Sequence, residues 1–281
     1  MKQETTLQKK NKGKTLADSG FISKLKDFLY PLLMLLTGTK VQYKINKVNE
    51  YTPLPDKPII FVANHGAFSD TPIVLRATEK RSYVLAGIQN LAFIDYVFFS
   101  LNGAVWVDRK DKADMAASKD AILEYLKKGQ SILWFPEGTW NLTANQLMMP
   151  IKWGIIDVAR QADAQIIPIA LHYDREKMIC FVKFAKPMYG ADFEDKAEAI
   201  CNLRDSIATM RWEFMSKQPV LSRREHEIVS MQKEMNLVID EYPPLDWEYE
   251  KSCIYSPNPL VEIIPFGLVP KRENLFLFRK D

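Results

Sequence analysis

The middle of the chain alternates short apolar runs with segments of helical periodicity. Six runs between residues 58 and 185 predict strands, at 59–63, 83–86, 104–107, 131–135, 165–171 and 178–184. Helical spacing recurs between them near 70–77, 88–101, 112–128 and 151–162, and Gly129 is suited to end the third of these helices. The alternation predicts an α/β fold with a mostly parallel central sheet flanked by helices. In such sheets, reactive groups lie beyond the carboxyl ends of the strands.

The segment before this region has a different pattern. Apolar residues at positions 21, 25, 28, 32 and 36 recur at three- and four-residue steps, which predicts an amphipathic helix. Taken alone, such a stripe favours packing on the domain's own core. Residues 1–20, however, hold five lysines against Glu4 and Asp18, a surplus of three that equals the net charge of the whole chain. Basic residues beside an apolar helix face are typical of helices that bind anionic lipid.

These patterns divide the chain into four parts. We expect a flexible basic tail over 1–20, an amphipathic membrane-associating segment over 21–50, an α/β domain over 51–218, and a C-terminal extension over 219–281. The extension begins at a break around Gln218-Pro219, and six of the chain's 16 prolines lie between Pro243 and Pro270. We therefore expect it to be helical at first and irregular towards its end.

Composition excludes several classes of protein. A chain with 47% apolar and 26% charged residues is globular, and a net charge of +3 over 281 residues does not suggest nucleic-acid binding. Three scattered cysteines, at 180, 201 and 253, provide neither a disulfide framework nor a zinc site, so a reducing compartment is expected. No apolar run is long enough for a spanning helix, and no secretory cleavage pattern is visible.

One of the three histidines lies where the α/β pattern predicts chemistry. His65 and Asp70 stand in Asn64-His65-Gly66-Ala67-Phe68-Ser69-Asp70, between a strand end and a helix start. A carboxylate at this spacing can fold back onto the imidazole, fix its tautomer and stabilise the imidazolium. An isolated pair of this kind more often consists of a helix-capping aspartate and an incidental histidine.

Three further segments, each at a predicted strand, favour a catalytic interpretation of His65 and Asp70 over a capping one. Asp108-Arg109 follows one strand, Pro136-Glu137-Gly138-Thr139 follows the next, and Ile167-Pro168-Ile169 lies on a third. Together with the His65 segment, and in this order, they resemble the four sequence blocks of the glycerophospholipid acyltransferase family, the PlsC-like 1-acyl-sn-glycerol-3-phosphate acyltransferases. The resemblance covers roughly residues 58–185.

The resemblance implies a membrane-associated O-acyltransferase of phospholipid biosynthesis. Its donor would be acyl-CoA or acyl carrier protein as cosubstrate, its acceptor a lysophospholipid such as 1-acyl-glycerol-3-phosphate, and its location the cytoplasmic face of an anionic membrane. No cofactor or metal is expected. It also implies catalysis by His65 and Asp70 and an acceptor pocket formed by Arg109 and the turn Glu137-Gly138-Thr139. Three neighbouring residues complete the candidate substrate-binding set: Asn64, Trp140 and Lys152.

One position departs from the family pattern. The third block usually continues Gly-Thr-Arg-Ser, whereas here Trp140-Asn141 follows Gly138-Thr139. An indole cannot neutralise a phosphate, so either Lys152 replaces the lost charge or Trp140 faces a different acceptor, such as a quaternary ammonium. Two other readings stay open, a lipid-binding module without turnover and an esterase that transfers the acyl group to water.

Overall fold

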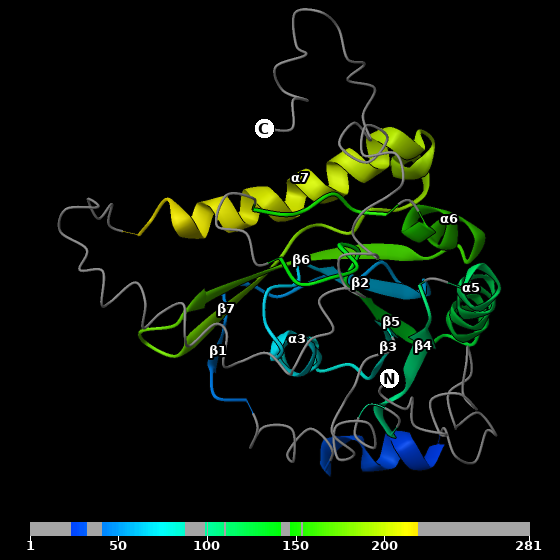
Figure 1. The fold of residues 1–281 in the computed structure, drawn as a ribbon, viewed down its shortest axis with the longest axis horizontal. Coiled ribbons are helices and arrows are strands. Elements are labelled where there is room, and N and C mark those ends of the chain that lie inside the picture. Colours follow the sequence, from blue (N-terminus) through cyan, green and yellow to red (C-terminus); the bar gives the residue numbers. More distant parts are fainter. Residues whose placement is uncertain are drawn as a thin grey trace, which may run out of the picture.

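The computed structural model describes residues 24–32, 41–87, 99, 101–109, 111–141, 147–152 and 154–218. Within them, seven strands form one sheet in the order β1-β7-β6-β2-β5-β3-β4 (Figure 1). All neighbouring strands pair in parallel except β6 and β7, which form an antiparallel hairpin. The strands are β1 (Lys44–Lys47), β2 (Ile59–Ala63), β3 (Ser82–Gly87), β4 (Ala104–Val107), β5 (Ser131–Trp134), β6 (Gln165–Asp174) and β7 (Ile179–Phe184).

Helices cover both faces of this sheet. On one face lies α3 (Asp70–Thr78), and on the other lie α5 (Lys112–Lys127), α6 (Gly154–Gln161) and α7 (Lys196–Met215), with the short 3₁₀ helix η1 (Gly190–Phe193) before α7 (Figure 1). Alternate side chains of the central strands fill two separate cores. Ile60 and Val62 of β2 point towards α5, α6 and α7, whereas Phe61 and Ala63 point towards α3. Burial on both faces explains why β2 is apolar at every position.

The predicted α/β class with a mostly parallel sheet is confirmed, and the strands at 59–63 and 104–107 have the predicted ends. Strand β6 continues to Asp174, three residues beyond the expected end, because its last residues pair with β7. The helix expected over 151–162 is α6, which starts at Gly154. Most of the segment expected as a helix at 88–101, and all of 219–281, lie outside the described residues.

Strand β1 was not expected from the pattern. It lies inside the 21–50 range that the sequence assigned to membrane association, and it pairs in parallel with β7. Its sequence, Lys-Ile-Asn-Lys, is short and contains three polar residues out of four, so period and composition alone do not predict a strand there. The strand forms because the exposed edge of β7 offers unpaired backbone groups.

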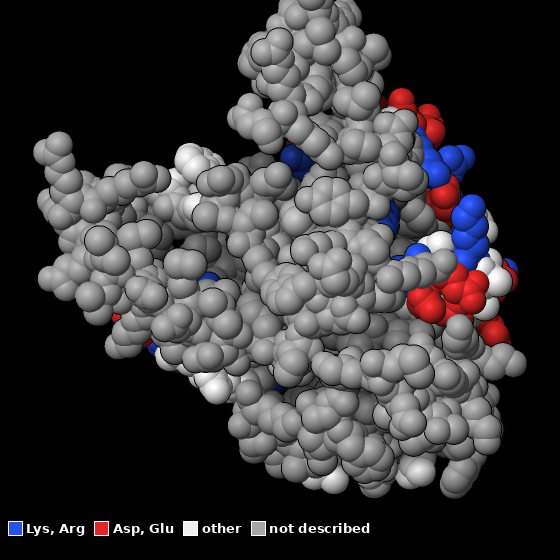
Figure 2. Space-filling model, in the orientation of Figure 1, with Lys and Arg blue, Asp and Glu red and all other residues white. Residues whose placement is uncertain are grey.

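Residues 24–32, the described part of the predicted 21–36 segment, are helical. None of the described helices is long and apolar enough to cross a bilayer. On the side of the molecule where α5 and α6 lie, lysines and acids are interspersed rather than segregated (Figure 2). This mixed surface agrees with the absence of a net charge on the sequence outside residues 1–20.

Candidate active site

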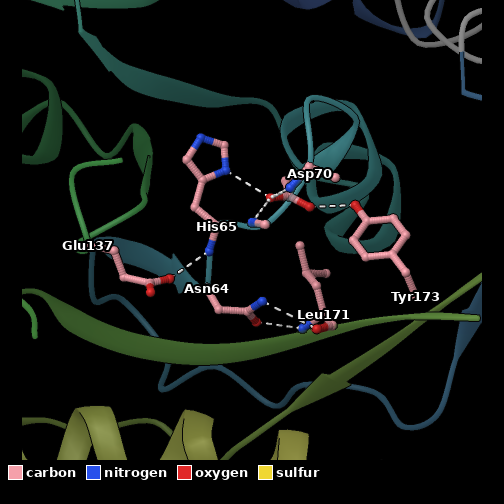
Figure 3. A network of polar contacts seen from close by, with 8 residues as sticks. Asn64, His65, Asp70, Glu137, Leu171 and Tyr173 are labelled. Atoms are coloured by element: carbon pink, nitrogen blue, oxygen red, sulfur yellow. Dashed lines mark hydrogen bonds and ion pairs between the residues drawn. The ribbon is translucent and has the colours of Figure 1, made fainter. Parts of the chain in front are cut away.

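The His65–Asp70 pair lies at the carboxyl edge of the sheet, between β2 and α3. His65 Nδ1 is 2.8 Å from Asp70 Oδ2, and Asp70 is the first residue of α3 (Figure 3). Since the carboxylate accepts this hydrogen bond, Nδ1 carries the proton and Nε2 is left with a free lone pair on the far side of the ring. The imidazole is thereby oriented as a base.

Asp70 is fully buried, and its carboxylate accepts several further hydrogen bonds. Oδ2 accepts from the backbone N–H groups of Gly66 at 2.6 Å and Ala67 at 2.9 Å, while Oδ1 accepts from the hydroxyl of Tyr173 on β6 (Figure 3). A buried carboxylate is stable only when its oxygens are satisfied in this way. The loop of residues 64–69 therefore folds around Asp70, which does more here than begin a helix.

Two aromatic rings enclose the imidazole. Phe135, directly after β5, stacks on His65 with ring centroids 4.2 Å apart and an interplanar angle of 19°. Trp140 lies at 5.6 Å from the same ring in a tilted arrangement and is almost fully buried. The residue at which the sequence departs from the family pattern therefore forms part of the wall beside His65.

Glu137 lies under the histidine loop rather than in the pocket wall. One carboxylate oxygen accepts from the backbone N–H of His65 at 2.8 Å (Figure 3). The other accepts from the backbone N–H of Met149 at 2.7 Å. Burial raises the pKa of Glu137 to about 7, against the opposing effect of these two hydrogen bonds and of Arg211. Glu137 thus ties the His65 loop to the segment at 147–152.

A cavity of about 370 Å³ opens beside His65. This volume is typical of small-molecule sites. Its apolar part lies between β3, β4, β5 and α5, and the side chains that line this part include Val84, Leu85, Phe99, Trp106, Met115, Ile122 and Trp134. The hydroxyl of Ser118, which also lines the cavity, is held by the carbonyl groups of Trp106 and Asp114.

The polar part of the same cavity contains three of the predicted acceptor-binding residues: the cations Arg109 and Lys152, and Gly138 at a turn. Arg109 donates to the carbonyl of Gly138, and Lys152 passes beside the same glycine. Gly138 has a φ of 74°, and a side chain on Gly87 would come within 3.1 Å of the Arg109 guanidinium. The missing side chain of Gly87 thus makes room for the Arg109 guanidinium, whereas Gly138 is favoured by the left-handed backbone conformation of its turn. Thr139 and Lys119 also line the cavity.

Asn64 is placed differently from the other predicted residues. Its side chain accepts from the N–H of Leu171 at 2.8 Å and donates to the carbonyl of the same residue at 3.3 Å, so it joins the end of β2 to β6 (Figure 3). Tyr173 and Phe135, by contrast, touch the His–Asp pair but were not among the predicted site residues. Their positions at the carboxyl ends of β6 and β5 are the signal that would have found them.

No group of three or more His, Cys, Asp or Glu side chains suited to a metal ion occurs among the described residues. Fold and site together define an α/β protein in which a histidine–aspartate base faces a cavity with an apolar and a cationic part. A histidine base beside such a cavity is suited to activating a hydroxyl group of a bound molecule.

Comparison with known proteins identifies a matching family. Residues 44–172 match the model of the Acyltransferase family. The chain is 30% identical over 145 residues to a 1-acyl-sn-glycerol-3-phosphate acyltransferase of Saccharomyces cerevisiae, which covers 50% of this chain and 46% of the yeast protein. It is also 30% identical over 180 residues to 1-acyl-sn-glycerol-3-phosphate acyltransferase LPAT1 of Arabidopsis thaliana, covering 59% and 49% of the two chains.

A solved structure agrees in fold. The 1-acyl-sn-glycerophosphate acyltransferase PlsC of Thermotoga maritima superposes with a TM-score of 0.56 at 15% identity, over 73% of this chain and 86% of that one. Residues 44–172 thus match the Acyltransferase family, and the same region is similar in sequence to 1-acyl-sn-glycerol-3-phosphate acyltransferases. The chain spans about half the length of the curated relatives it matches.

Proposed function

We propose that the protein transfers a fatty acyl group from an acyl thioester to the hydroxyl of a lysophospholipid. The observation that carries this proposal is the His65–Asp70 pair, oriented as a base at 2.8 Å and opening onto a cavity that is apolar on one side and cationic on the other. The apolar part suits an acyl chain, and the cations suit a phosphate. The family match supports the same reaction class.

The reaction requires no covalent intermediate with the protein. His65 Nε2 takes the proton of the acceptor hydroxyl while its oxygen attacks the thioester carbonyl, and Asp70 stabilises the imidazolium that forms. The carbon–sulfur bond then breaks, and the departing thiolate takes the proton from the imidazolium. An ester and a free thiol are the products, and the histidine is restored.

We propose a phosphate-bearing acceptor such as 1-acyl-glycerol-3-phosphate, with acyl-CoA or acyl carrier protein as donor. Support comes from Arg109, Lys119 and Lys152, which line the same cavity as His65. The names of the yeast and Arabidopsis relatives point to the same acceptor. Trp140, in place of the usual arginine, packs beside His65, so the phosphate charge would be met by the three cations instead.

Thiol release from acyl-CoA in the presence of 1-acyl-glycerol-3-phosphate tests the reaction. We expect His65→Ala to lower kcat by about 100-fold or more, because general-base assistance is lost. His226→Ala, a histidine far from these motifs in the sequence, is the matched control and should retain the parent rate.

Mass spectrometry of the lipid products, after one labelled thioester is offered with a mixture of lysophospholipids, identifies the acceptor. An undiminished rate in His65→Ala would contradict the proposed base. Thiol release at full rate without any acceptor would instead identify a thioesterase, and lysolipid binding without turnover across several donors would identify a lipid-binding module.

We further propose that the protein binds the surface of an anionic membrane, at its cytoplasmic face, through the helix at 24–32. The polar side of this helix meets the domain: Lys26 is buried, Asp27 pairs with Arg81 at 2.5 Å, and the Tyr30 hydroxyl donates to the carbonyl of Lys80 at 3.3 Å. The apolar stripe, in contrast, faces outward, with Leu25, Phe28 and Leu32 exposed by 44%, 81% and 52%. A helix packed for its own core would show the reverse orientation.

Lipid is the occupant that fits both the stripe and the charge of the sequence before it. The apolar side chains would enter the acyl region, and the five lysines of residues 1–20 would meet anionic headgroups. Co-sedimentation with phosphatidylglycerol-containing vesicles provides the test. We expect Leu25→Ser/Phe28→Ser/Leu32→Ser to weaken binding about tenfold or more, because three apolar side chains lose burial in lipid.

The matched control changes three exposed apolar side chains elsewhere, Val48→Ser/Leu54→Ser/Met215→Ser, and should bind as the parent does. Raising salt should also weaken binding, because it screens the lysines. Equal binding by the parent and the stripe variant would place the membrane contact on another surface.

A further inference from the structure

Tyr173 connects the His65–Asp70 pair to a strand that the reaction scheme does not otherwise use. It lies near the end of β6, 103 residues after Asp70, and its hydroxyl donates to Asp70 Oδ1 (Figure 3). The other carboxylate oxygen, Oδ2, is held by groups of residues 65–67, all from the loop that Asp70 closes. The two oxygens are thus fixed from two separate parts of the chain.

The two carboxylate oxygens of Asp70 therefore have different roles. Local backbone donors hold Oδ2 in place against His65 Nδ1, but they belong to the same short loop and move with it. Tyr173 ties the carboxylate to the sheet, whose strands are paired over many residues. A hydrogen bond from an element outside the loop therefore sets the plane of the carboxylate relative to the imidazole.

The ring of Tyr173 is itself held by its neighbours. Tyr43, which is buried, meets it edge to face with centroids 4.8 Å apart, and the Arg175 guanidinium lies 5.5 Å from its ring centre. Its cross-strand neighbour on β7 is Cys180. A hydroxyl on a ring so confined keeps its direction, which is a requirement for a positioning residue.

We infer that Tyr173 is a positioning residue of the His–Asp pair. Its hydroxyl holds Asp70 in the orientation that aligns His65, and it withdraws part of the carboxylate's charge from the imidazole. This inference rests on the proposed function for its kinetic consequence, whereas its effect on His65 itself can be measured without turnover.

Tyr173→Phe removes the hydroxyl and keeps the ring against Tyr43 and Arg175. We expect kcat for acyl transfer to fall about tenfold with little change in KM, because one hydrogen bond to a charged group is lost from the catalytic pair and none from the substrate. We also expect the acid limb of the kcat/KM profile to move to higher pH. A carboxylate without the tyrosine donor attracts the imidazolium more strongly.

The matched control is Tyr51→Phe. The hydroxyl of Tyr51 is also partly buried, and it donates to the carbonyl of Thr78 at 3.0 Å, away from Asp70. The charge of Asp70 also affects the pKa of three other groups: Glu137 after β5, Cys180 on β7 and Arg211 on α7. They are present in both variants and in the parent, so their contributions to the profile cancel in the comparison.

The imidazole signals followed by NMR through a pH titration separate the possible failures. His65 is assigned with a His65→Gln variant, and its titration midpoint should rise in Tyr173→Phe but not in Tyr51→Phe. A raised midpoint in a protein that transfers no acyl group would contradict the proposed function alone. Unchanged kcat, profile and midpoint in Tyr173→Phe, or equal changes in Tyr51→Phe, would overturn the role of Tyr173.

Discussion

At the scale of single residues, Glu137 has a role that its position in the sequence did not suggest. The family resemblance implied contact with the acceptor, and that contact stays a prediction. The structure places the carboxylate between the backbone N–H groups of His65 and Met149, where it is nearly inaccessible. Two buried donors facing two acceptor oxygens are fully satisfied only when the carboxylate is ionised, whereas burial favours the protonated form.

This conflict predicts a pH dependence of stability. The pKa of Glu137 is raised from its ordinary value of 4.5 to about 7, so the folded state holds a proton that the unfolded state releases. The contribution of Glu137 to the free energy of unfolding is therefore largest at low pH and falls as pH rises from about 4.5 to about 7. The total fall is at most about 3 kcal/mol.

Urea unfolding of the parent and of Glu137→Gln at several pH values between 4.5 and 8 measures this contribution. The glutamine does not titrate, so we expect the free energy of unfolding of the variant to fall less over this range than that of the parent. We also expect a lower kcat, because the amide N–H₂ opposes one of the two backbone N–H groups. Parallel pH curves for the two proteins would contradict the raised pKa.

At the scale of elements, α7 covers the face of the sheet opposite α3, and its last turns contact the segment before Met149, next to the site. Arg211 donates to the carbonyl of Leu147, in the segment before Met149. Glu213 pairs with Lys183 of β7, and Phe214 stacks on His172 of β6 with centroids 5.5 Å apart and an angle of 10°. This end of the helix is thus attached through titratable and charged groups as well as through the apolar core.

The attachment of α7 should weaken in acid. Burial, and the nearby Arg211 to a lesser extent, lower the pKa of His172 below its ordinary 6.5. The unfolded chain therefore takes up a proton that the folded state resists, and stability is lost as pH falls through about 6.5. We expect His172→Phe, which keeps an aromatic ring against Phe214, to lose less stability than the parent between pH 7.5 and 5.

Thermal unfolding at these two pH values, with Tyr51→Phe as a control for the loss of one polar group, provides the measurement. The stability contributed by His172 falls as pH is lowered, whereas that contributed by Glu137 falls as pH is raised. The two variants therefore separate the two contributions. If His172→Phe and the parent lost equal stability on acidification, the protonation of His172 would not be involved.

At the scale of the whole molecule, the topology explains why distant residues meet. Strand β2 lies between β5 and β6, so the loop carrying His65 is flanked by the end of β5, with Phe135 and Glu137, and by the end of β6, with Tyr173. The sequence predicted that reactive groups would gather at this edge. It did not predict which strands would be neighbours, because pairing depends on long-range contacts that local patterns do not contain.

The sequence by itself determined the α/β class, the buried strands, the loop from His65 to Asp70 and the stripe of the N-terminal helix. Each of these follows from period, capping or spacing within a few residues. Only the tertiary structure decided that Tyr173 and Glu137 support His65 from opposite sides, and that the helix at 24–32 presents Leu25, Phe28 and Leu32 outward. Hydrogen bonds between residues tens of positions apart, and the choice of which helix face packs, form only when the elements come together.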